Sequence, residues 1–385
     1  MFIILFTLAQ AAGAWFFWRR TVAAAALPRP WRFGLALLFL GLTALVPVAV
    51  ILSWTQPREQ VLLWTLLAYL WVGLLWYGLL WGLSLWLPAL ALRLRRSGEN
   101  RSKKESDFSR RTFLRRTTAG ATALGATATA AVGWRGAWDW QVEEVVIPLA
   151  KLPPALDGFR LVQLSDLHVG PLYGEAFMKQ VQDRVRQLRP DAIAITGDVI
   201  DGSVSRLRQD VAPLGGLKAP YGTFLVSGNH EYYSGIGPWL NHFRSLGLQV
   251  LANQHQTLGE PGAAFQIAGV HDYRGGAFGP EFAPDMEAAL SGRDLDLACV
   301  LLAHQPAHVH QAGQLGVDLQ LSGHTHGGQL WPFGYLTSLV QPYLQGTHHH
   351  GEQTWIHVNR GTGLWGPPMR VLAPPEITLV VLTSA

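Results

Sequence analysis

Five short apolar runs in the second half of the chain are each followed directly by a cluster of Asp, Asn or His residues. Runs of this length and composition, bounded by Gly and polar residues, predict buried β-strands. The clusters begin at Asp166, Asp198, Asn229, His304 and His324. Polar side chains just past strand ends converge on the carboxyl edge of an α/β sheet, where such folds bind their ligands. The sequence therefore predicts an α/β domain with one polar site.

These clusters contain the donors that a two-metal site needs. Zinc, iron and manganese take imidazole nitrogen and carboxylate oxygen, and a bimetallic site uses about seven such groups, including a bridging carboxylate. The alternative is a coincidence of polar turns, and Asn229 taken alone also fits a left-handed turn position. The predicted metal ligands are Asp166, His168, Asp198, Asn229, His304, His324 and His326.

The order of the motifs resembles that of the calcineurin-like metallophosphoesterase superfamily, over roughly residues 143–385. The motifs are Asp166-x-His168, Gly197-Asp198-x-x-Asp201, Gly228-Asn229-His230-Glu231, His304 and Gly323-His324-x-His326. The run Gly323 to Gln329, Gly361-Thr-Gly and Pro375-Glu-Ile resemble the bacterial membrane-anchored branch. The resemblance implies a fold of two mixed β-sheets sandwiched between helices, preceded here by an α-helical transmembrane region.

The resemblance also implies residue roles. It assigns the first metal to Asp166, His168, Asp198 and His326, and the second to Asp198, Asn229, His304 and His324. The two divalent ions, Mn, Fe or Zn, would share a hydroxide that attacks phosphorus. His230 would donate a proton to the leaving group, and Asp201 would orient His230. For Asp201 the alternative is a solvated turn aspartate before Gly202.

Other polar residues give weaker signals. His271 and Asp272 follow an apolar run and are candidates for an outer part of the site. The triplet from His348 to His350 fits either metal binding or an exposed polar loop. Arg274 and Arg370 are candidates for a phosphate clamp. The single Cys299 excludes a disulfide framework and thiolate metal ligation.

Residues 1–92 differ in composition from the rest of the chain. All 14 histidines lie at or beyond His168. Three apolar runs near 2–17, 34–54 and 61–92 are close to or above the roughly 17 to 20 residues that cross a bilayer as a helix. We expect three transmembrane helices, with a buried core helix as the alternative for the shortest run, 2–17. Residues 117–140 predict a fourth crossing or signal anchor.

Basic residues set the expected orientation. The loops after the first and third runs are rich in arginine, and the loop after the second carries only Arg58 beside Glu59. The positive-inside rule then makes 93–116 a flexible cytoplasmic linker and places 141–385, the metallophosphoesterase domain, outside the cytoplasm. The linker run from Ser109 to Arg115 resembles a twin-arginine signal, and a basic stop-transfer loop is the alternative. The expected location is a bacterial inner (cytoplasmic) membrane, crossed several times.

Two classes of function fit this sequence. The first is a membrane-anchored hydrolase of phosphodiesters, phosphomonoesters or pyrophosphates, including a lipid-intermediate pyrophosphatase like the UDP-diacylglucosamine hydrolases. The second is a non-catalytic membrane sensor that binds a phosphorylated ligand. Residues 141–385 carry 14 Lys+Arg against 21 Asp+Glu, so a nucleic-acid partner is not expected. The expected partners are a phosphorylated small molecule or lipid, the membrane and the twin-arginine translocase.

Overall fold

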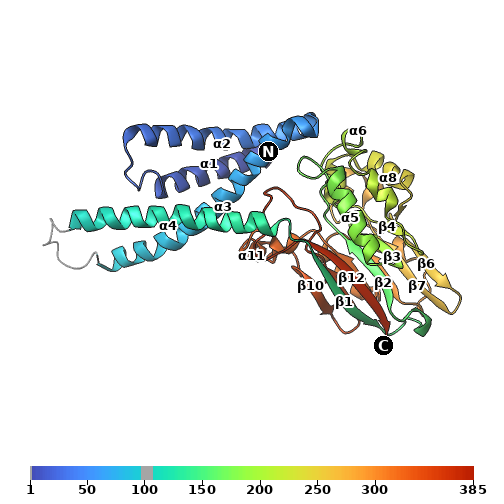
Figure 1. Ribbon diagram of the computed structural model, residues 1–385. Coiled ribbons are helices and arrows are strands. Elements are labelled where there is room, and N and C mark those ends of the chain that lie inside the picture. Colours follow the sequence, from blue (N-terminus) through green and yellow to red (C-terminus); the bar gives the residue numbers. More distant parts are fainter. Residues whose placement is uncertain (1, 97–106) are drawn as a thin grey trace. The chain divides into compact units, whose positions relative to one another are not determined.

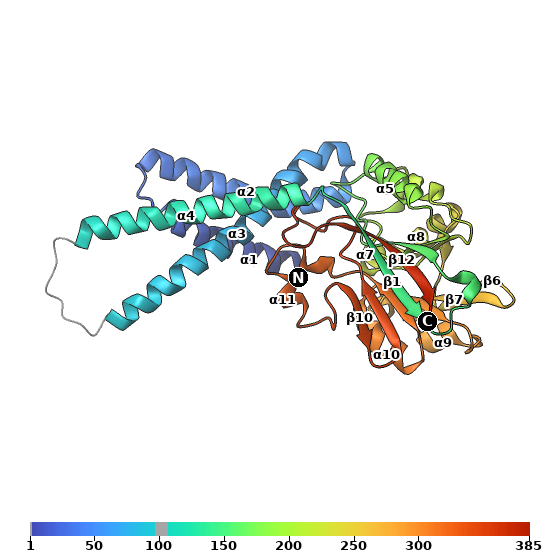
Figure 2. The ribbon, with the colours of Figure 1, turned by 60° about the horizontal axis from the view of Figure 1, so that its bottom comes forward.

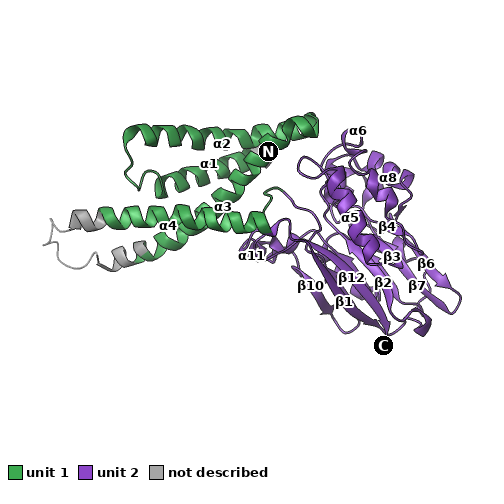
Figure 3. Ribbon diagram, viewed as in Figure 1, with its two compact units in different colours: residues 1–135, 366–369 green, residues 136–365, 370–385 purple. Residues whose placement is uncertain are grey.

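The computed structural model describes residues 2–96 and 107–385 (Figure 1). The chain divides into two compact units (Figure 3). The first unit comprises residues 1–135 and 366–369, and the second comprises Gly136–Trp365 and Arg370–Ala385. The short segment Gly366–Met369 therefore belongs with the helices, although it lies within the sequence of the predicted metal domain.

The first unit is helical. Two of its helices are long and apolar enough, by length and composition, to cross a membrane: α2 and the Arg58–Pro88 part of α3. Among the described residues, α1 and α4 do not meet that test, so the crossings near 2–17 and 117–140 stay predictions. The helices are α1 (Phe2–Arg20), α2 (Arg29–Thr55), α3 (Arg58–Arg96) and α4 (Asp107–Gly136).

The prediction of a flexible linker at 93–116 is wrong where the structure describes that segment. Helix α3 continues to Arg96, and α4 begins at Asp107. The run from Ser109 to Arg115 therefore lies within a helix. Arg and Leu are good helix formers, and the segment continues directly into an alanine-rich stretch, so the helix extends without a break. The rest of that prediction, 97–106, lies outside the described residues.

The second unit contains two six-stranded mixed sheets (Figures 1 and 2). The first sheet has the order β1–β12–β2–β3–β4–β5, and the second has the order β10–β11–β9–β8–β7–β6. The first sheet consists of β1 (Gln141–Leu149), β2 (Phe159–Leu164), β3 (Ala192–Ile195), β4 (Thr223–Leu225), β5 (Gln249–Val250) and β12 (Glu376–Ser384). The second consists of β6 (Gln254–Glu260), β7 (Ala263–Gly269), β8 (Cys299–Leu302), β9 (Leu319–Ser322), β10 (Gly346–His350) and β11 (Thr354–Val358).

Helices cover the outer faces of the sheets. The sequence predicts helices at Glu175–Leu188 and Pro238–Leu246, and the structure confirms both, as α5 and α8. The α-helices of this unit are α5 (Glu175–Gln187), α6 (Val204–Leu207), α7 (Asn229–Tyr233), α8 (Ile236–Ser245), α9 (Met286–Leu290), α10 (Val309–Gln314) and α11 (Gly334–Thr337). The predicted fold class, two mixed sheets between helices, is therefore confirmed.

Side chains that alternate in direction along the strands form the two hydrophobic cores of this unit. Leu161 of β2 lies in a core shared with Phe265 of β7, between the two sheets. Its neighbour Val162 points to the opposite face of β2, into a second core that contains Met178 of α5 and Phe243 of α8. Successive side chains on a strand face opposite sides, so one apolar strand contributes to both cores. This explains why the strands have continuous apolar runs.

The parallel strands bring the predicted polar clusters to one region. In the first sheet β2, β3 and β4 are parallel neighbours, and in the second β8 and β9 are parallel neighbours. Near the ends of β2 and β9 the sheets are joined by a buried hydrogen bond of 2.8 Å from Gln163 Nε2 to the Ser322 carbonyl. The loops that follow these strands therefore meet at a common edge.

Candidate metal centre

The first group of convergent side chains consists of Asp166, His168 and His326. Their ligand atoms lie close enough to share a metal ion. The Nε2 atoms of His168 and His326 are 3.1 Å apart, and Asp166 Oδ1 is 3.3 Å from His326 Nε2. All three residues are buried. Three of the four residues predicted for the first metal are thus together.

The second group consists of Asp198, His304 and His324, which also lie within reach of one ion. His304 Nε2 is 3.2 Å from Asp198 Oδ2 and 3.2 Å from His324 Nδ1. Asp198 Oδ2 is also 3.9 Å from His168 Nε2 in the first group. Its other oxygen, Oδ1, accepts a 2.8 Å hydrogen bond from the His230 backbone N–H. Asp198 Oδ2 is therefore the atom that faces both groups, where the predicted bridge belongs.

The donor set fits divalent metal ions. Metal–ligand distances near 2.0 to 2.2 Å place neighbouring ligand atoms about 3 Å apart, which is close to the separations within each group. Asn229 Oδ1 is buried and has no hydrogen-bond partner among the described residues. A buried unpartnered carbonyl oxygen is costly unless it has a role, and metal coordination is one. The chemistry of the site therefore agrees with the predicted ligands.

Three histidines are oriented by partners on their other ring nitrogen. His304 Nδ1 donates to the Thr196 carbonyl at 2.8 Å, which directs Nε2 toward Asp198. Asp201 lies 3.1 Å from His168 Nδ1 and 2.5 Å from His230 Nδ1, using a different oxygen for each. A solvated turn aspartate would not hold two imidazoles. The geometry agrees with the prediction that Asp201 orients His230, and it adds His168 as a second partner.

The backbone at the candidate ligands is unusual. Asp166, His168, Asp198, His324 and His326 all have positive φ angles, between 46° and 71°. Residues other than Gly rarely adopt this conformation, and such strain persists where the surrounding structure enforces it, often at functional sites. Of the ten described non-glycine residues with positive φ, five are predicted metal ligands, so the strain is concentrated at the site.

Glycines allow the loops to approach one another. A Cβ atom on Gly323 would lie 1.9 Å from Ser165 Oγ and 2.3 Å from Asp166 Oδ2. A Cβ atom on Gly197, which has φ of 90°, would lie 2.4 Å from the Gly228 backbone nitrogen. Neither position has room for a side chain, which agrees with the expectation that backbone passes close to the site at Gly197.

Burial and neighbouring charges shift the pKa values of the histidines in different directions. Burial lowers the pKa of His304, but the carboxylate of Asp198 outweighs it and raises that pKa well above its usual value. Burial lowers the pKa of His326 to about 4, and burial together with the charge of His304 lowers that of His324 to about 4. A neutral imidazole has a lone pair for a metal. Burial also lowers the pKa of His230, but Asp198 and Asp201 outweigh it and raise that pKa to about 10. The two carboxylates therefore favour the protonated form of His230.

Carboxylates of the site stay ionised. Burial raises the pKa of Asp198, but His304 and His230 outweigh this effect and hold it below its usual range. The pKa of Asp201 is also lowered, because His168 and His230 outweigh burial. An ionised carboxylate can accept hydrogen bonds or bind a cation. Both aspartates therefore have the charge that their positions require.

The sequence analysis assigned no role to Glu231. In the structure its side chain links the backbone of the loops that carry Asp198 and Asn229. Its buried carboxylate accepts hydrogen bonds from the backbone N–H groups of Gly228, Asp198 and Val199, at 2.6, 3.0 and 2.7 Å. Burial and the charge of Asp198 raise its pKa to about 7, although these hydrogen bonds oppose the shift. A capping-box position three residues after Gly228 was the available signal. Glu231 thus joins the loops after β3 and β4.

Arg370 does not fit the predicted phosphate clamp. Its buried guanidinium donates to the backbone carbonyls of His326, Arg360, Gly361, Gly363 and Ala373. Its Nη1 and Nη2 atoms therefore hold the loops beside His326, and Arg370 is not free to clamp a phosphate. Arg274, in contrast, is exposed, and its charge acts on the hydroxyl of Tyr233. Tyr233 in turn lies 5.5 Å from the His230 ring, so only Arg274 remains near the site.

The other weak candidates lie outside the two groups. His271 Nδ1 is hydrogen bonded to the Tyr232 hydroxyl at 2.8 Å, and Asp272 accepts from Gln305 Nε2 at 3.0 Å. The triplet His348–His350 lies on β10, where His349 packs on Trp355 and His350 contacts Tyr343. Alternation along the strand puts His349 on the face opposite to His348 and His350, which both contact Tyr343, so the three rings do not meet at one point.

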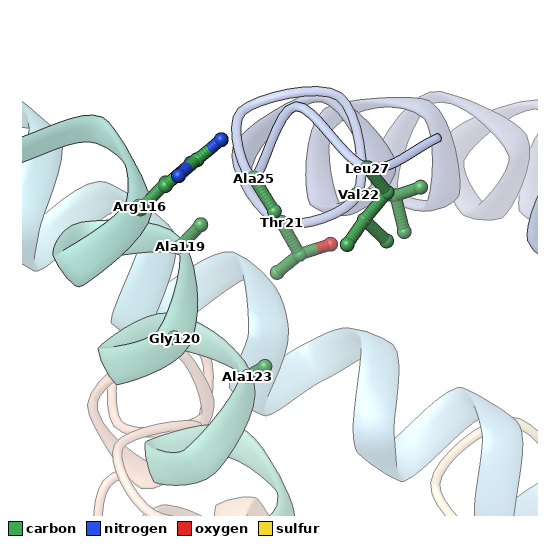
Figure 4. A pocket seen from close by; sticks show the side chains of 8 residues that line it. All are labelled: Thr21, Val22, Ala25, Leu27, Arg116, Ala119, Gly120 and Ala123. Carbon is green, nitrogen blue, oxygen red and sulfur yellow. The ribbon is translucent and has the colours of Figure 1, made fainter. Parts of the chain in front are cut away.

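A pocket in the first unit is unrelated to this chemistry. It has a volume of about 270 Å³ and is formed by the segment after α1 and by α4 (Figure 4). Its polar residues are Thr21 and Arg116, and the Thr21 hydroxyl already donates to the Phe17 carbonyl. This pocket therefore offers no group of convergent ligands.

Comparison with known proteins agrees with the motifs. Residues 159–328 match the family model described as "Calcineurin-like phosphoesterase". A Helicobacter pylori protein named "Uncharacterized metallophosphoesterase" is 39% identical over 254 residues, which are 65% of this chain and 66% of the relative. A Danio rerio protein named "Transmembrane protein with metallophosphoesterase domain" is 39% identical over 252 residues, which are 64% of this chain and 58% of the relative. This chain therefore spans less than two thirds of either relative.

A shorter relative is covered almost completely. An Aquifex aeolicus protein, also named "Uncharacterized metallophosphoesterase", is 34% identical over 243 residues, which are 63% of this chain and 91% of the relative. The matched residues, 159–328, include all nine residues predicted for metal binding and catalysis. On this evidence the chain belongs to the calcineurin-like phosphoesterase family.

Proposed function

We propose that the protein is a membrane-anchored phosphoesterase that uses two divalent metal ions, Mn, Fe or Zn. Asp166, His168 and His326 would hold one ion, and Asn229, His304 and His324 would hold the other. Asp198 would be a ligand of both ions. The observation that carries this proposal is the position of Asp198 Oδ2, which faces both groups while Oδ1 is held by the His230 backbone.

Divalent ions at such a site lower the pKa of water and neutralise phosphate charge. The chain's own residues would supply the rest of the chemistry. As water attacks phosphorus, the bond to the leaving oxygen breaks, and His230 Nε2 donates the proton that this oxygen needs. Asp201 accepts from Nδ1 of His230 and so keeps the proton-bearing Nε2 on the side of the ligand groups, 3.9 Å from Asp198 Oδ2. Tyr233, at the side of the His230 ring, would contact the organic part of the leaving group.

The membrane location extends the proposal. Two helices are long and apolar enough to cross a bilayer, and arginines flank the region in the pattern of a positive-inside topology. We place the protein in a bacterial cytoplasmic membrane with its metal domain outside. The twin-arginine-like motif supports export by the twin-arginine translocase. The substrate would then be a phosphorylated small molecule or lipid.

The test is metal-restored hydrolysis by the full chain in detergent micelles. The protein is stripped with a chelator and resupplied with manganese, and turnover of bis-p-nitrophenyl phosphate and p-nitrophenyl phosphate is measured. We expect manganese to restore turnover, with the ratio of the two rates giving the diester or monoester preference.

The matched variant is Asp198→Asn, which keeps the size of the side chain but removes its charge. It should lower turnover at least about 100-fold and reduce the bound metal. Undiminished turnover in this variant would exclude the two-metal mechanism. A folded, metal-loaded wild type without turnover would favour a phosphate-binding sensor.

A further inference from the structure

An apolar segment is exposed on the second unit. Between residues 331 and 340 the side chains of Tyr335, Leu339 and Val340 are 71%, 80% and 75% exposed, and Trp331 and Leu336 are also exposed. Single exposed apolar residues are ordinary, but a run of large ones marks an interaction surface. We call these five residues the apolar rim.

The sequence around the apolar rim has no charge. Between Asp318 and Glu352 there is no Asp, Glu, Lys or Arg. The segment also places a polar residue inside and apolar residues outside: Gln341 is buried and its Nε2 donates to Gln305 Oε1 at 3.3 Å. This arrangement is the reverse of a water-facing loop, whose apolar side chains would point inward.

The segment is held in place at both ends, next to the metal centre. It begins after Gly328, two residues beyond His326, and the Thr325 hydroxyl donates to the Leu344 carbonyl at 2.6 Å. In the middle, Gly328 and Gly334 are so close that a Cβ atom on Gly328 would lie 2.3 Å from the Gly334 Cα. The apolar rim is therefore an ordered projection from the motif that contributes His324 and His326.

A lipid bilayer suits this surface better than a protein partner. Two helices of the chain are long and apolar enough to cross a membrane, and the proposed membrane anchoring would keep a bilayer within reach of the second unit. Trp and Tyr at the rim, with Leu and Val beside them, match the composition that favours the membrane interface. The second unit is acidic overall, so it would attach by burying apolar side chains and not by attraction to anionic lipids.

We infer that the apolar rim inserts into the membrane surface and holds the metal centre at the level of the lipid headgroups. Given the phosphoesterase activity proposed above, on which this part rests, the substrate class is a phosphate ester carried by a membrane lipid. The lipid would keep its acyl chains in the bilayer while its phosphate reaches the residues around Asp198. Insertion itself does not depend on catalysis.

Insertion is measured on the full chain in phosphatidylcholine nanodiscs. The only native cysteine, Cys299, is buried, so a cysteine introduced by Leu339→Cys can be labelled selectively with an environment-sensitive nitrobenzoxadiazole dye. The matched control is Leu295→Cys, an exposed leucine on the same unit but outside the apolar rim. We expect lipids with a spin label on the acyl chain to quench the dye at 339 and not at 295.

Two results would overturn the inference. Equal exposure of both dyes to water would show that the rim does not insert. Shielding of the dye at 339 without quenching by the lipid spin label would show that protein covers it, either the chain's own helices or a second copy. Quenching that persists in high salt would support insertion of apolar side chains over charge attraction.

The substrate class is tested by a ratio of rates. The double variant Leu339→Glu with Val340→Glu is compared with wild type on phosphatidic acid and phosphatidylglycerol in nanodiscs, and on the soluble p-nitrophenyl esters. We expect the ratio of lipid to soluble turnover to fall at least about tenfold, since insertion loses two apolar side chains. The control Leu295→Glu should keep the ratio. A ratio unchanged in the double variant would show that the apolar rim does not bring the lipid to the metal centre, and wild type that cleaves the soluble esters but neither lipid would refute the lipid substrate.

The failure of the two proposals can be told apart. If wild type hydrolyses neither the lipids nor the soluble esters, the phosphoesterase proposal fails while the quenching result still decides insertion. If soluble esters are cleaved and the dye at 339 stays in water, the phosphoesterase proposal stands and the membrane inference fails.

Discussion

Asp198 and Asp201 are three residues apart, yet their environments give them different tasks. Asp198 is buried among imidazoles, and one of its oxygens faces both ligand groups. Asp201 is partly exposed and accepts from the Nδ1 atoms of His168 and His230. A carboxylate that fixes two rings determines where their Nε2 atoms point, which is how outer partners tune metal sites. At the residue scale, position relative to the histidines separates a proposed bridge from an orienting group.

His230 provides the clearest test at this scale. Replacing His230 with Ala should leave metal content near normal, because its Nε2 atom is not part of either proposed ligand set. Turnover should fall about 100-fold or more if Nε2 is the proton donor. The loss should be larger for phenyl phosphate esters than for p-nitrophenyl esters, because p-nitrophenolate leaves readily without a proton. Metal analysis and the two rates provide the measurement.

The same measurements would also reveal a wrong role for His230. Loss of metal from His230→Ala would show that His230 is a ligand. An equal loss of rate with both leaving groups would show that it stabilises charge instead of donating a proton.

At the scale of elements, the site depends on tight loops after parallel strands. The loops after β2, β3 and β9 carry the residues with positive φ, and glycines next to them leave no room for a Cβ atom. The strands are fixed by sheet pairing and by the two cores, so the strain in the loops is supported by the packing beneath. The loops can be tested separately from the chemistry.

Gly323→Ala should disturb the first ligand group. The new methyl group would meet Ser165 Oγ and Asp166 Oδ2, and displacement of Asp166 should weaken metal binding at least about tenfold. The control is Gly237→Ala in α8, where a Cβ atom meets nothing within 4 Å. Titration with manganese after stripping measures both. Equal metal affinity in the two variants would show that the loop after β9 can move aside.

Glu231→Gln should lower stability. The carboxylate accepts three backbone N–H groups, whereas the amide presents an NH2 group to at least one of them, at a cost on the order of 1 to 3 kcal/mol. The midpoint of thermal unfolding should fall by roughly 3 to 10 °C. Glu352→Gln, at an exposed turn, is the control and should change little. No shift in Glu231→Gln would mean that the loops hold together without it.

At the scale of the whole molecule, the chain combines a helical unit with an acidic metal domain. Histidine is confined to residues 168 and beyond, and most arginines of residues 1–140 flank the apolar runs, in segments that the positive-inside rule places in the cytoplasm. The positive overall charge comes from residues 1–140, with 16 Lys+Arg against 5 Asp+Glu, whereas residues 141–385 are acidic. This distribution predicts which side of the membrane the domain occupies.

Reporter fusions test that orientation. Alkaline phosphatase, which is active only outside the cytoplasm, should be active when fused after Ala385 and inactive when fused near residue 100. The reason is that the arginines around residues 19–32 and 93–116 keep those segments inside. The reverse pattern would place the metal domain in the cytoplasm and favour the alternative, a lipid-intermediate pyrophosphatase.

Much of the site could be predicted from the sequence because its information is local. An apolar run followed by Asp-x-His or Gly-Asn-His-Glu specifies a strand, its end and a donor, and parallel strands end at one edge. The α5 and α8 helices were equally predictable from their periodicity. The linker was mispredicted at 107–116 because charge was given more weight than the helix-forming tendency of Arg and Leu.

The tertiary structure decided the features that depend on residues far apart in the sequence. β12 pairs in parallel with β1 and antiparallel with β2, and no local pattern specifies such a partner. Arg370 carries a guanidinium group of the kind that binds anions. In the fold this group is buried and donates to backbone carbonyls instead. The sequence by itself determined which donors the chain offers and near which strand ends. Folding decided their partners, because hydrogen bonding and burial depend on what packs against each group.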